Sequence, residues 1–144
     1  MSVSNRLKAL REEKAAANLS AAEFFLAENA NQEGVVVLSS GLQYQILVEG
    51  HGEKPALHHV VTCHYHGTLT NGEVFDSSVK RGQPASFPVN GVIKGWVEAL
   101  QLMSVGSKWR LFLHPNLAYG DRQVSAVIGP NCALVFDVEL ISFR

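Results

Sequence analysis

Long hydrophobic runs are absent from this chain, although 47% of its 144 residues are hydrophobic. Residues 1–6 contain no apolar run after their basic residue, and residues 7–18 are charged and rich in alanine. The chain as given therefore predicts neither a secretory signal nor a membrane span. This favours the cytoplasm, with the periplasm as the alternative if a leader has been removed.

Cysteine is scarce as well. Cys63 and Cys132 are the only two, and each lies in an apolar, strand-like context. We interpret both as buried free thiols rather than as a disulfide. A zinc site would need histidine as well, and His64 and His66 would share one strand face. No carboxylate or thiolate has a matching position beside them, so we expect no metal and no other cofactor.

Neither sign of charge dominates, because 12 Lys+Arg stand against 13 Asp+Glu. There is no basic stripe to predict nucleic-acid binding and no basic run to predict an anionic membrane surface. Two catalytic fingerprints are also missing. No Gly-rich phosphate cradle precedes a helix, and the Gly-x-Ser-x-Gly elbow of many hydrolases does not occur. Nucleotide-dependent enzymes and serine hydrolases are therefore disfavoured.

Residues 1–33 read as an N-terminal helical arm. Residues 5–29 are rich in helix-forming residues and contain neither Gly nor Pro, which predicts a helix. A capping box at residues 20–23 would allow a second helix to begin there, but no breaker intervenes and we favour one continuous helix. A thin apolar stripe predicts packing on one small surface or on a partner. Its members are Leu7, Leu10, Ala17, Ala21 and Phe24.

Residues 34–144 are predicted to form one domain around a short amphipathic helix within residues 92–103. Apolar side chains at the i, i+3, i+4, i+7 spacing share one face of this helix: Trp96, Ala99, Leu100 and Met103. Strand-like segments flank the helix on both sides, so its apolar face must lie on the sheet that they form. The first of these residues, Trp96, would sit at the edge of the core, either as the floor of a cavity or as core filler.

Short apolar runs and alternating patterns predict strands at residues 35–38, 42–48, 61–66, 86–89, 109–113 and 134–140. Asn71-Gly72, between β-type residues, predicts a hairpin with a type I′ turn. Residues 79–84 are predicted as a loop, and so are residues 121–131, whose apolar tip is of the kind that often closes a binding site. The fold class is therefore α+β, with an antiparallel sheet wrapped on one short helix and preceded by a helical arm.

Aromatic side chains occupy inward positions and loop edges of this predicted fold. They are Tyr65, Phe75, Phe87, Trp96, Tyr119 and Phe136. Asp76 is the only carboxylate among them. An apolar pocket of this kind suits binding, or a reaction that needs neither a nucleophile nor a base.

Four motifs resemble, in order, those of the FKBP-type peptidyl-prolyl cis-trans isomerases. They are His66-Gly67-Thr68-Leu69-x-Asn71-Gly72-x-x-Phe75-Asp76-Ser77-Ser78, Val92-Ile93-x-Gly95-Trp96, Leu117-Ala118-Tyr119-Gly120 and the strand at residues 134–140. The likeness extends from about residue 41 to residue 143. Residues 34–44 further resemble the bacterial Mip/FklB-like subgroup, in which an α-helical region, often a dimerisation module, precedes the isomerase domain.

The resemblance implies a bent antiparallel sheet around the helix, and rotamase activity on proline-containing peptides and unfolded proteins during protein folding. The catalytic residues that it implies are Tyr65, Asp76, Trp96, Tyr119 and Phe136. The additional substrate-binding residues that it implies are Phe75, Phe87, Val92, Ile93 and Ile128. Inhibitors such as FK506 and rapamycin are expected in the same pocket.

Two departures from the family pattern affect the expected pocket. Ala85 stands where many eukaryotic members have an aromatic residue, which opens one wall, and Gly129-Pro130 replaces the Pro-Pro of many members. Two other functions stay open. A chaperone would grip proline-containing segments with little turnover, and a scaffold would dimerise through the N-terminal helix. Because the arm is short for the subgroup, we expect a monomer or a weak dimer.

Overall fold

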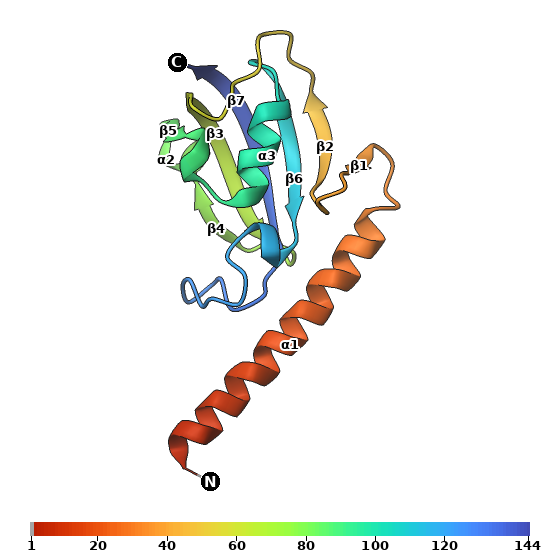
Figure 1. Cartoon of the computed structure of the whole chain (residues 1–144), viewed down its shortest axis with the longest axis vertical. Helices are drawn as coiled ribbons and strands as arrows, with labels where there is room; N and C mark the ends of the chain where they lie inside the picture. The colour runs from red at the N-terminus through yellow and green to blue at the C-terminus, as the bar shows by residue number, and fades with distance from the viewer. Residues whose placement is uncertain (1) are drawn as a thin grey trace.

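The computed structural model describes residues 2–144, so Met1, the first residue of the expected arm, lies outside the described part (Figure 1). One long helix, α1 (Val3–Asn29), extends well beyond the rest of the molecule. The side chain of Ser2 caps its start by accepting a hydrogen bond from the Asn5 N–H at 3.1 Å. The helix is continuous through Ser20, as predicted. No helix among residues 2–144 is long and apolar enough to cross a membrane.

Within the described residues, seven strands form one antiparallel sheet. They are β1 (Val35–Val37), β2 (Gln43–Val48), β3 (Val60–Leu69), β4 (Val74–Ser77), β5 (Ala85–Pro88), β6 (Lys108–Leu113) and β7 (Leu134–Phe143). The order across the sheet is β1-β2-β6-β7-β3-β4, and β5 pairs with β3. The two ten-residue strands, β3 and β7, therefore lie side by side near its middle.

The short helix α3 (Lys94–Leu102) lies across the sheet (Figure 1). Its predicted apolar face is confirmed, since Trp96, Ala99 and Leu100 are buried and Met103 follows them into the core. Gly95 allows a close approach, because a Cβ at this position would lie 2.6 Å from Leu113 Cδ2 on β6. This contact brings the start of α3 against the sheet and so fixes where Trp96 sits.

The hairpin between β3 and β4 forms where it was predicted, but its turn is not type I′. That turn needs positive φ at Asn71 and Gly72, and among non-glycine residues of the described chain only Asn131 has positive φ. The Leu69 N–H donates to the Glu73 carbonyl and the Gly72 N–H donates to the Leu69 carbonyl. These bonds fit a three-residue loop, in which a type I turn is followed by a left-handed glycine.

A helical turn, α2 (Ser78–Arg81), occupies the first half of the segment predicted as a loop at residues 79–84. Ser77 caps its N-terminus by accepting a hydrogen bond from the Lys80 N–H at 3.2 Å. Gly82 ends it with a left-handed φ of 75°. Four residues are too few to show a helical period in the sequence. Only the two capping residues, Ser77 and Gly82, could have indicated this helix.

The face of α1 that meets the sheet is not the predicted stripe. Leu7 and Leu10 are each 54% exposed and Phe24 is 69% exposed, whereas Ala22 and Leu26 are buried. Next to them, the ring of Phe25 lies 6.3 Å from that of Phe112 on β6. The pattern identified residues that share a face, but α1 docks through another face.

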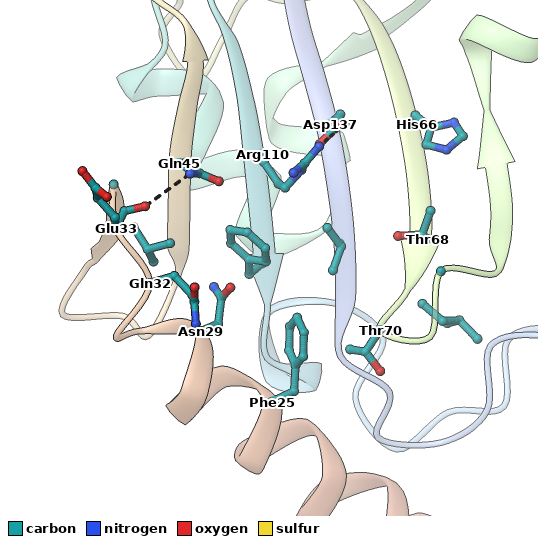
Figure 2. Close-up of a pocket in the computed structure, with 16 residues that line it drawn as sticks. Phe25, Asn29, Gln32, Glu33, Gln45, His66, Thr68, Thr70, Arg110 and Asp137 are labelled. Carbon is teal, nitrogen blue, oxygen red and sulfur yellow. Dashed lines mark hydrogen bonds and ion pairs between the residues drawn. The ribbon is translucent and has the colours of Figure 1, made fainter.

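Polar side chains fasten the C-terminal end of α1 to β2. Asn29 Nδ2 donates to Gln43 Oε1 at 2.8 Å, and Gln43 Nε2 donates to the Leu26 carbonyl at 2.9 Å. Figure 2 shows Phe25 and Asn29 at this end of α1, close to the strands. The helix is therefore anchored by its last turns, and its first turns extend away from the sheet.

Both cysteines are free thiols, as predicted. Cys63 on β3 is fully buried, and this burial raises the pKa of its thiol to about 12. Cys132, just before β7, is only partly buried, which corrects the expectation that both are buried. The difference arises because Cys132 lies at the end of a loop rather than inside the alternating pattern of a strand.

Candidate active site

A hollow of about 950 Å³ lies beside α3, and all ten of the site residues expected from the sequence line it. They are Tyr65, Phe75, Asp76, Phe87, Val92, Ile93, Trp96, Tyr119, Ile128 and Phe136. The sheet contributes side chains from β3, β4, β5 and β7, and the others come from α3, from the residues just before it, and from the segment between β6 and β7. The structure thus brings together residues that are up to 71 positions apart in the chain, from 65 to 136.

The base of the hollow is a cluster of edge-on aromatic rings around Trp96. Its ring centroid lies 5.5 Å from that of Tyr65, 5.7 Å from that of Phe87 and 5.2 Å from that of Phe136. The interplanar angles are 79°, 83° and 86°. Such contacts add about 0.5–1.5 kcal/mol each beyond the burial of area. The result is a rigid apolar floor, in which Trp96 and Phe136 are each only 4% exposed.

The indole N–H of Trp96 has no acceptor within this cluster. Among the described residues it is the one buried side-chain nitrogen or oxygen without a hydrogen-bond partner. Leaving a buried donor unpaired costs about 1–3 kcal/mol. An indole at this position is therefore retained for its large flat surface rather than for a hydrogen bond.

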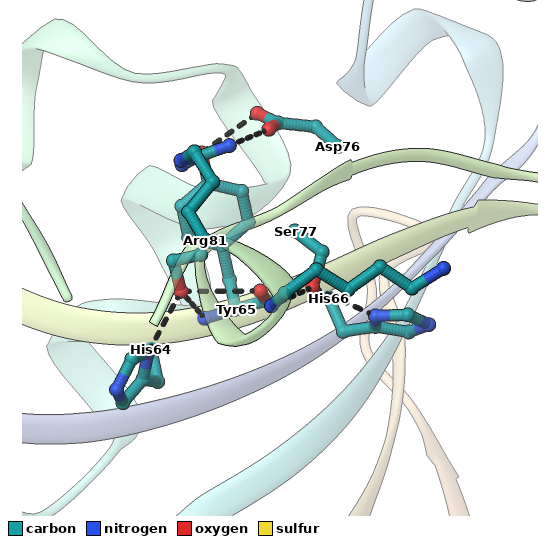
Figure 3. Close-up of polar contacts among 8 residues, drawn as sticks. His64, Tyr65, His66, Asp76, Ser77 and Arg81 are labelled. Carbon is teal, nitrogen blue, oxygen red and sulfur yellow. Dashed lines mark hydrogen bonds and ion pairs between the residues drawn. The ribbon is translucent and has the colours of Figure 1, made fainter. Parts of the chain in front are cut away.

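One wall of the hollow is polar and consists of Tyr65 and Asp76, and Arg81 binds both of them from outside the hollow (Figure 3). Tyr65 Oη donates to Asp76 Oδ2 at 2.6 Å, and Arg81 Nη2 donates to Tyr65 Oη at 2.9 Å. Arg81 Nη1 also pairs with Asp76 Oδ1. Sequence reasoning missed Arg81 because it assigned this segment to a loop. The serine N-cap and glycine C-cap of α2 are the sequence signal that could have indicated a helical turn here. That turn places Arg81 next to Asp76 on β4.

The charges of this wall keep its carboxylate ionised. Burial alone raises the pKa of Asp76, but hydrogen bonds from Tyr65 and Arg81, together with the charge of Arg81, outweigh it and hold that pKa below its ordinary value. Burial, and then Asp76, raise the pKa of Tyr65 above its ordinary value. At neutral pH the pair is therefore a carboxylate and a phenol. Both oxygens of the carboxylate are engaged, which suits a fixed dipolar wall better than a base.

Two serines fasten this wall to the strand behind it. Ser78 Oγ accepts from the Tyr65 N–H at 2.7 Å and donates to the Tyr65 carbonyl at 3.2 Å. His64 Nδ1 lies 2.9 Å from Ser78 Oγ, and His66 Nδ1 lies 2.9 Å from Ser77 Oγ (Figure 3). The two histidines face away from the hollow and are half-buried, each held by a serine of the α2 segment. No three His, Cys, Asp or Glu residues within 2–144 gather to hold a metal ion.

A second hollow, of about 890 Å³, lies on the other side of the sheet near the end of α1 (Figure 2). None of the ten expected site residues lines it. Its principal charges neutralise each other, since Arg110 binds both carboxylate oxygens of Asp137, at 2.7 and 3.0 Å. On its rim, Gln45 Nε2 donates to the Glu33 carbonyl at 3.3 Å. Because the ten expected residues line the other hollow, and Arg110 and Asp137 neutralise each other here, we take the aromatic hollow as the candidate active site.

Two family models match the chain. A sequence model described as "FKBP-type peptidyl-prolyl cis-trans isomerase" matches residues 51–141. A second, described as "Domain amino terminal to FKBP-type peptidyl-prolyl isomerase", matches residues 1–46. The first covers the sheet from before β3 into β7, and the second covers α1, β1 and most of β2.

Over the aligned stretches, curated relatives are about half identical to this chain. The "FKBP-type 22 kDa peptidyl-prolyl cis-trans isomerase" of Escherichia coli is 50% identical over 96% of this chain and 68% of its own length. The "Peptidyl-prolyl cis-trans isomerase Mip" of Coxiella burnetii is 53% identical over 83% of this chain and 52% of its own. The "Outer membrane protein MIP" of Legionella longbeachae is 50% identical over 91% and 56%. The chain therefore spans only about half the length of the last two.

Solved structures show the same fold. FkpA from Escherichia coli superimposes with a TM-score of 0.90 at 41% identity, over 95% of this chain and 64% of that one. A peptidyl-prolyl cis-trans isomerase from Pseudomonas syringae gives a TM-score of 0.84 at 38% identity, over 90% and 96%. The expected α+β architecture is thereby confirmed. The family model that matches residues 51–141, together with the relatives about 50% identical, shows that the chain belongs to the family of FKBP-type peptidyl-prolyl cis-trans isomerases.

Proposed function

We propose that the chain is a peptidyl-prolyl cis-trans isomerase that acts on proline-containing peptides and unfolded proteins through the aromatic hollow. The observation that carries the proposal is the apolar floor around Trp96, faced by one fixed polar wall and by no nucleophile–base pair. Rotation about a peptide bond is slow because amide resonance must be broken, at a barrier of about 18–20 kcal/mol. In the twisted state the carbonyl is less polar, so a dry aromatic hollow binds that state better than the planar amide.

The roles proposed for the lining residues follow from their positions. Trp96 supports the proline ring, and the side chains that surround it are Phe75, Phe136, Tyr65 and Val92. Tyr119 is 37% exposed, and its hydroxyl makes no hydrogen bond within residues 2–144, so it is free to donate to a substrate carbonyl. The N–H of Ile93, at the N-cap of α3, donates to no acceptor within the described residues. We propose that it donates to a second carbonyl of the substrate.

The test is a proline-isomerisation assay on a chromogenic tetrapeptide with a central Phe-Pro bond. Trp96→Ala, Phe136→Tyr and Asp76→Leu should each lower kcat/KM, with about tenfold corresponding to 1.4 kcal/mol of lost transition-state stabilisation. Gln45→Ala, on the rim of the second hollow, is the matched control and should leave the rate unchanged. Unchanged kcat/KM in all three site variants would remove this assignment.

The same hollow is proposed as the binding site for macrolides such as FK506 and rapamycin. The support is its apolar lining, which matches the apolar ring systems of such ligands, and the membership of the chain in the family. FK506 should compete with the tetrapeptide and quench Trp96 fluorescence. A Trp96-dependent isomerase that FK506 neither inhibits nor quenches would contradict this part of the proposal alone.

A chaperone function without turnover is the alternative use of the hollow. The two functions differ in stoichiometry when a protein with a proline-limited refolding phase is the substrate. A catalyst accelerates the slow phase when it is present well below the substrate concentration, whereas a binding protein needs one copy for each substrate chain. We favour catalysis because the polar and aromatic residues of the site are all present.

We also propose that residues 1–33 form an arm separate from the isomerase domain at residues 34–144, and that it supports a weak homodimer. A seam of exposed apolar residues runs along α1 at alternating spacings that suit helix pairing. The seam comprises Val3, Leu7, Leu10, Ala17, Ala21 and Phe24. Sedimentation at increasing concentration should show a dimer that Leu10→Glu abolishes. A monomer at every concentration would leave the arm without this role.

The compartment stays a prediction. The sequence favours the cytoplasm, and the periplasm is the alternative. One relative is named an outer membrane protein, which supports the alternative. Fractionation of cells that express the complete gene product would decide between the two.

A further inference from the structure

The segment at residues 121–131, the pocket loop, forms one wall of the aromatic hollow. Its neck is closed by the Asn131 N–H, which donates to the Gly120 carbonyl at 2.8 Å. Near its tip, Ile128 is 5% exposed and faces the hollow, and Val124 and Ser125 also line it. The position of this loop therefore sets the width of the proposed binding site.

Hydrogen bonds within the pocket loop make its tip a small, self-supporting unit. The Val124 N–H donates to the Ile128 carbonyl at 3.0 Å. Ser125 Oγ accepts from the N–H groups of Val127 and Ile128, at 3.2 and 3.0 Å. A loop tied within itself in this way moves as a body, so its placement depends on what holds its two ends.

The C-terminal end of the pocket loop is held by α1, through two amide side chains that point in opposite directions. Asn18, in the middle of α1, donates from Nδ2 to the Pro130 carbonyl at 2.8 Å. Asn131 donates from Nδ2 to the Ala15 carbonyl of α1 at 3.1 Å. Asn131 has a φ of 56°, and it is the only non-glycine residue of the described chain with positive φ. Both bonds are partly buried.

The backbone of the pocket loop at Gly129 also packs closely on side chains of α1. A Cβ at Gly129 would lie 3.3 Å from Lys14 Cε and 3.4 Å from Asn18 Nδ2, so a glycine lets the loop lie directly on α1. Asn18 Nδ2 also lies 3.8 Å from Cys132 Sγ. Asparagine is a poor residue for the interior of a helix, because its side chain competes with the backbone for hydrogen bonds. At position 18 that side chain is used for the loop instead.

We infer that Asn18 and Asn131 are positioning residues, through which α1 holds the pocket loop in place to shape the substrate site. The inference rests on the proposed isomerase function. Neither residue touches the hollow, so their effect passes through the loop to Ile128. Because coupling between two sites is reciprocal, a substrate that orders the loop also strengthens the contact between the loop and α1. The arm thus supports the site through the pocket loop, in addition to being a candidate interface.

The first experiment separates binding from turnover. Asn18→Ala and Asn131→Gly each remove one of the two bonds, and glycine keeps the positive φ of position 131. Each should raise KM for the tetrapeptide about threefold to tenfold, the range that one net hydrogen bond represents, with kcat changed less than twofold. Ser20→Ala, on an exposed part of the same helix, is the control and should change neither. Circular dichroism melting shows whether each variant is folded.

The second experiment reads the contact itself without using activity. Cys132 lies beside Asn18, so its alkylation by iodoacetamide reports separation of the loop from α1. Asn18→Ala should accelerate this alkylation about threefold or more, while Cys63 stays unmodified as an internal control. Saturation of the wild-type chain with the tetrapeptide should slow it.

The results of these two experiments distinguish failure of the inference from failure of the proposed function. Folded Asn18→Ala and Asn131→Gly variants with wild-type KM overturn the inference, even if Cys132 becomes more reactive, because α1 would then cover the loop without shaping the site. Equal loss in kcat and in thermal stability would also overturn it, since that is the result of general unfolding. An inactive wild-type chain would instead refute the proposed function. The effect of the tetrapeptide on Cys132 alkylation would then decide whether the loop and α1 are coupled.

Discussion

Arg81 on α2 and Asp76 on β4 form an ion pair at the mouth of the aromatic hollow, and both hold the hydroxyl of Tyr65. Arg81 is largely exposed, and its guanidinium also lies 5.6 Å from the centre of the Tyr65 ring. The polar wall is therefore built partly from the solvent side, by a residue whose aliphatic stem and charged end can be altered without opening the core.

Replacement of Arg81 should weaken the site more than the fold. Arg81→Met keeps the length of the stem but removes the donors to Asp76 and Tyr65, so we expect kcat/KM to fall about threefold to tenfold, as for the loss of one charge-assisted bond. Thermal melting should change little because the pair is exposed. Lys80→Met, one residue earlier, is the matched control and should have wild-type kinetics. Equal rates for the two variants would mean that the wall does not depend on Arg81.

The pKa of Asp76 predicts how stability depends on pH. Because the folded-state pKa is lowered, the interaction stabilises the fold above the unfolded-state value of about 3.9 and is lost as pH falls through the folded value. Urea unfolding of wild type and Asp76→Asn should therefore give a constant difference in the free energy of unfolding from pH 5 to pH 8. The difference should shrink below about pH 4. A difference that grows on acidification would reverse the sign assigned to this group.

The two thiols should react very differently. The pKa of Cys63 is raised to about 12 and its side chain is fully buried, so at pH 8 it is a protonated, inaccessible thiol. Cys132 is partly exposed and should be the first to be alkylated. Peptide mass analysis after brief iodoacetamide treatment should find the label on Cys132 alone, and on both cysteines after unfolding in urea. Native labelling of Cys63 would show that β3 opens readily.

The close approach of α3 to β6 can be tested at Gly95. Gly95→Ala would place a methyl group 2.6 Å from Leu113 Cδ2, so Leu113 or the helix must move. Overpacking of this kind costs about 1–3 kcal/mol, more than alanine returns through its better helix propensity. We expect a lower melting temperature and reduced isomerase activity, because Trp96 follows directly. Lys94→Ala, exposed at the start of the same helix, should melt like the wild type.

The sequence predicted the core of the site because periodicity and aromatic content both reflect burial. Trp96 and Met103 were assigned to one inner face from spacing alone. Tyr119 was found as an aromatic residue at a loop edge, and the resemblance to the family gave it a catalytic role and added Ile128 to the site. Features with no repeat were missed. The four residues of α2, and with them Arg81, are fixed by caps and by contacts with β3 rather than by a pattern.

Competition between alternatives explains the other errors. Asn71-Gly72 suits a type I′ turn, yet the hydrogen bond from the Leu69 N–H to the Glu73 carbonyl closes a loop of three residues, and only Gly72 takes positive φ. For α1, two faces carry small and apolar residues, and the sheet covers the one that contains Ala22 and Leu26. Long-range contacts, such as the bond from Asn18 to Pro130, leave no local trace in a single sequence.

The short helix α2 constrains how the family fold can vary in this chain. Ser77 and Ser78 secure its start against β3, and Arg81 secures its end to β4, so both ends are fixed over a single turn. One inserted residue would rotate Arg81 by about 100° and aim it away from Asp76. Length changes should therefore be tolerated after Gly82, in the connection to β5, and not within the turn itself.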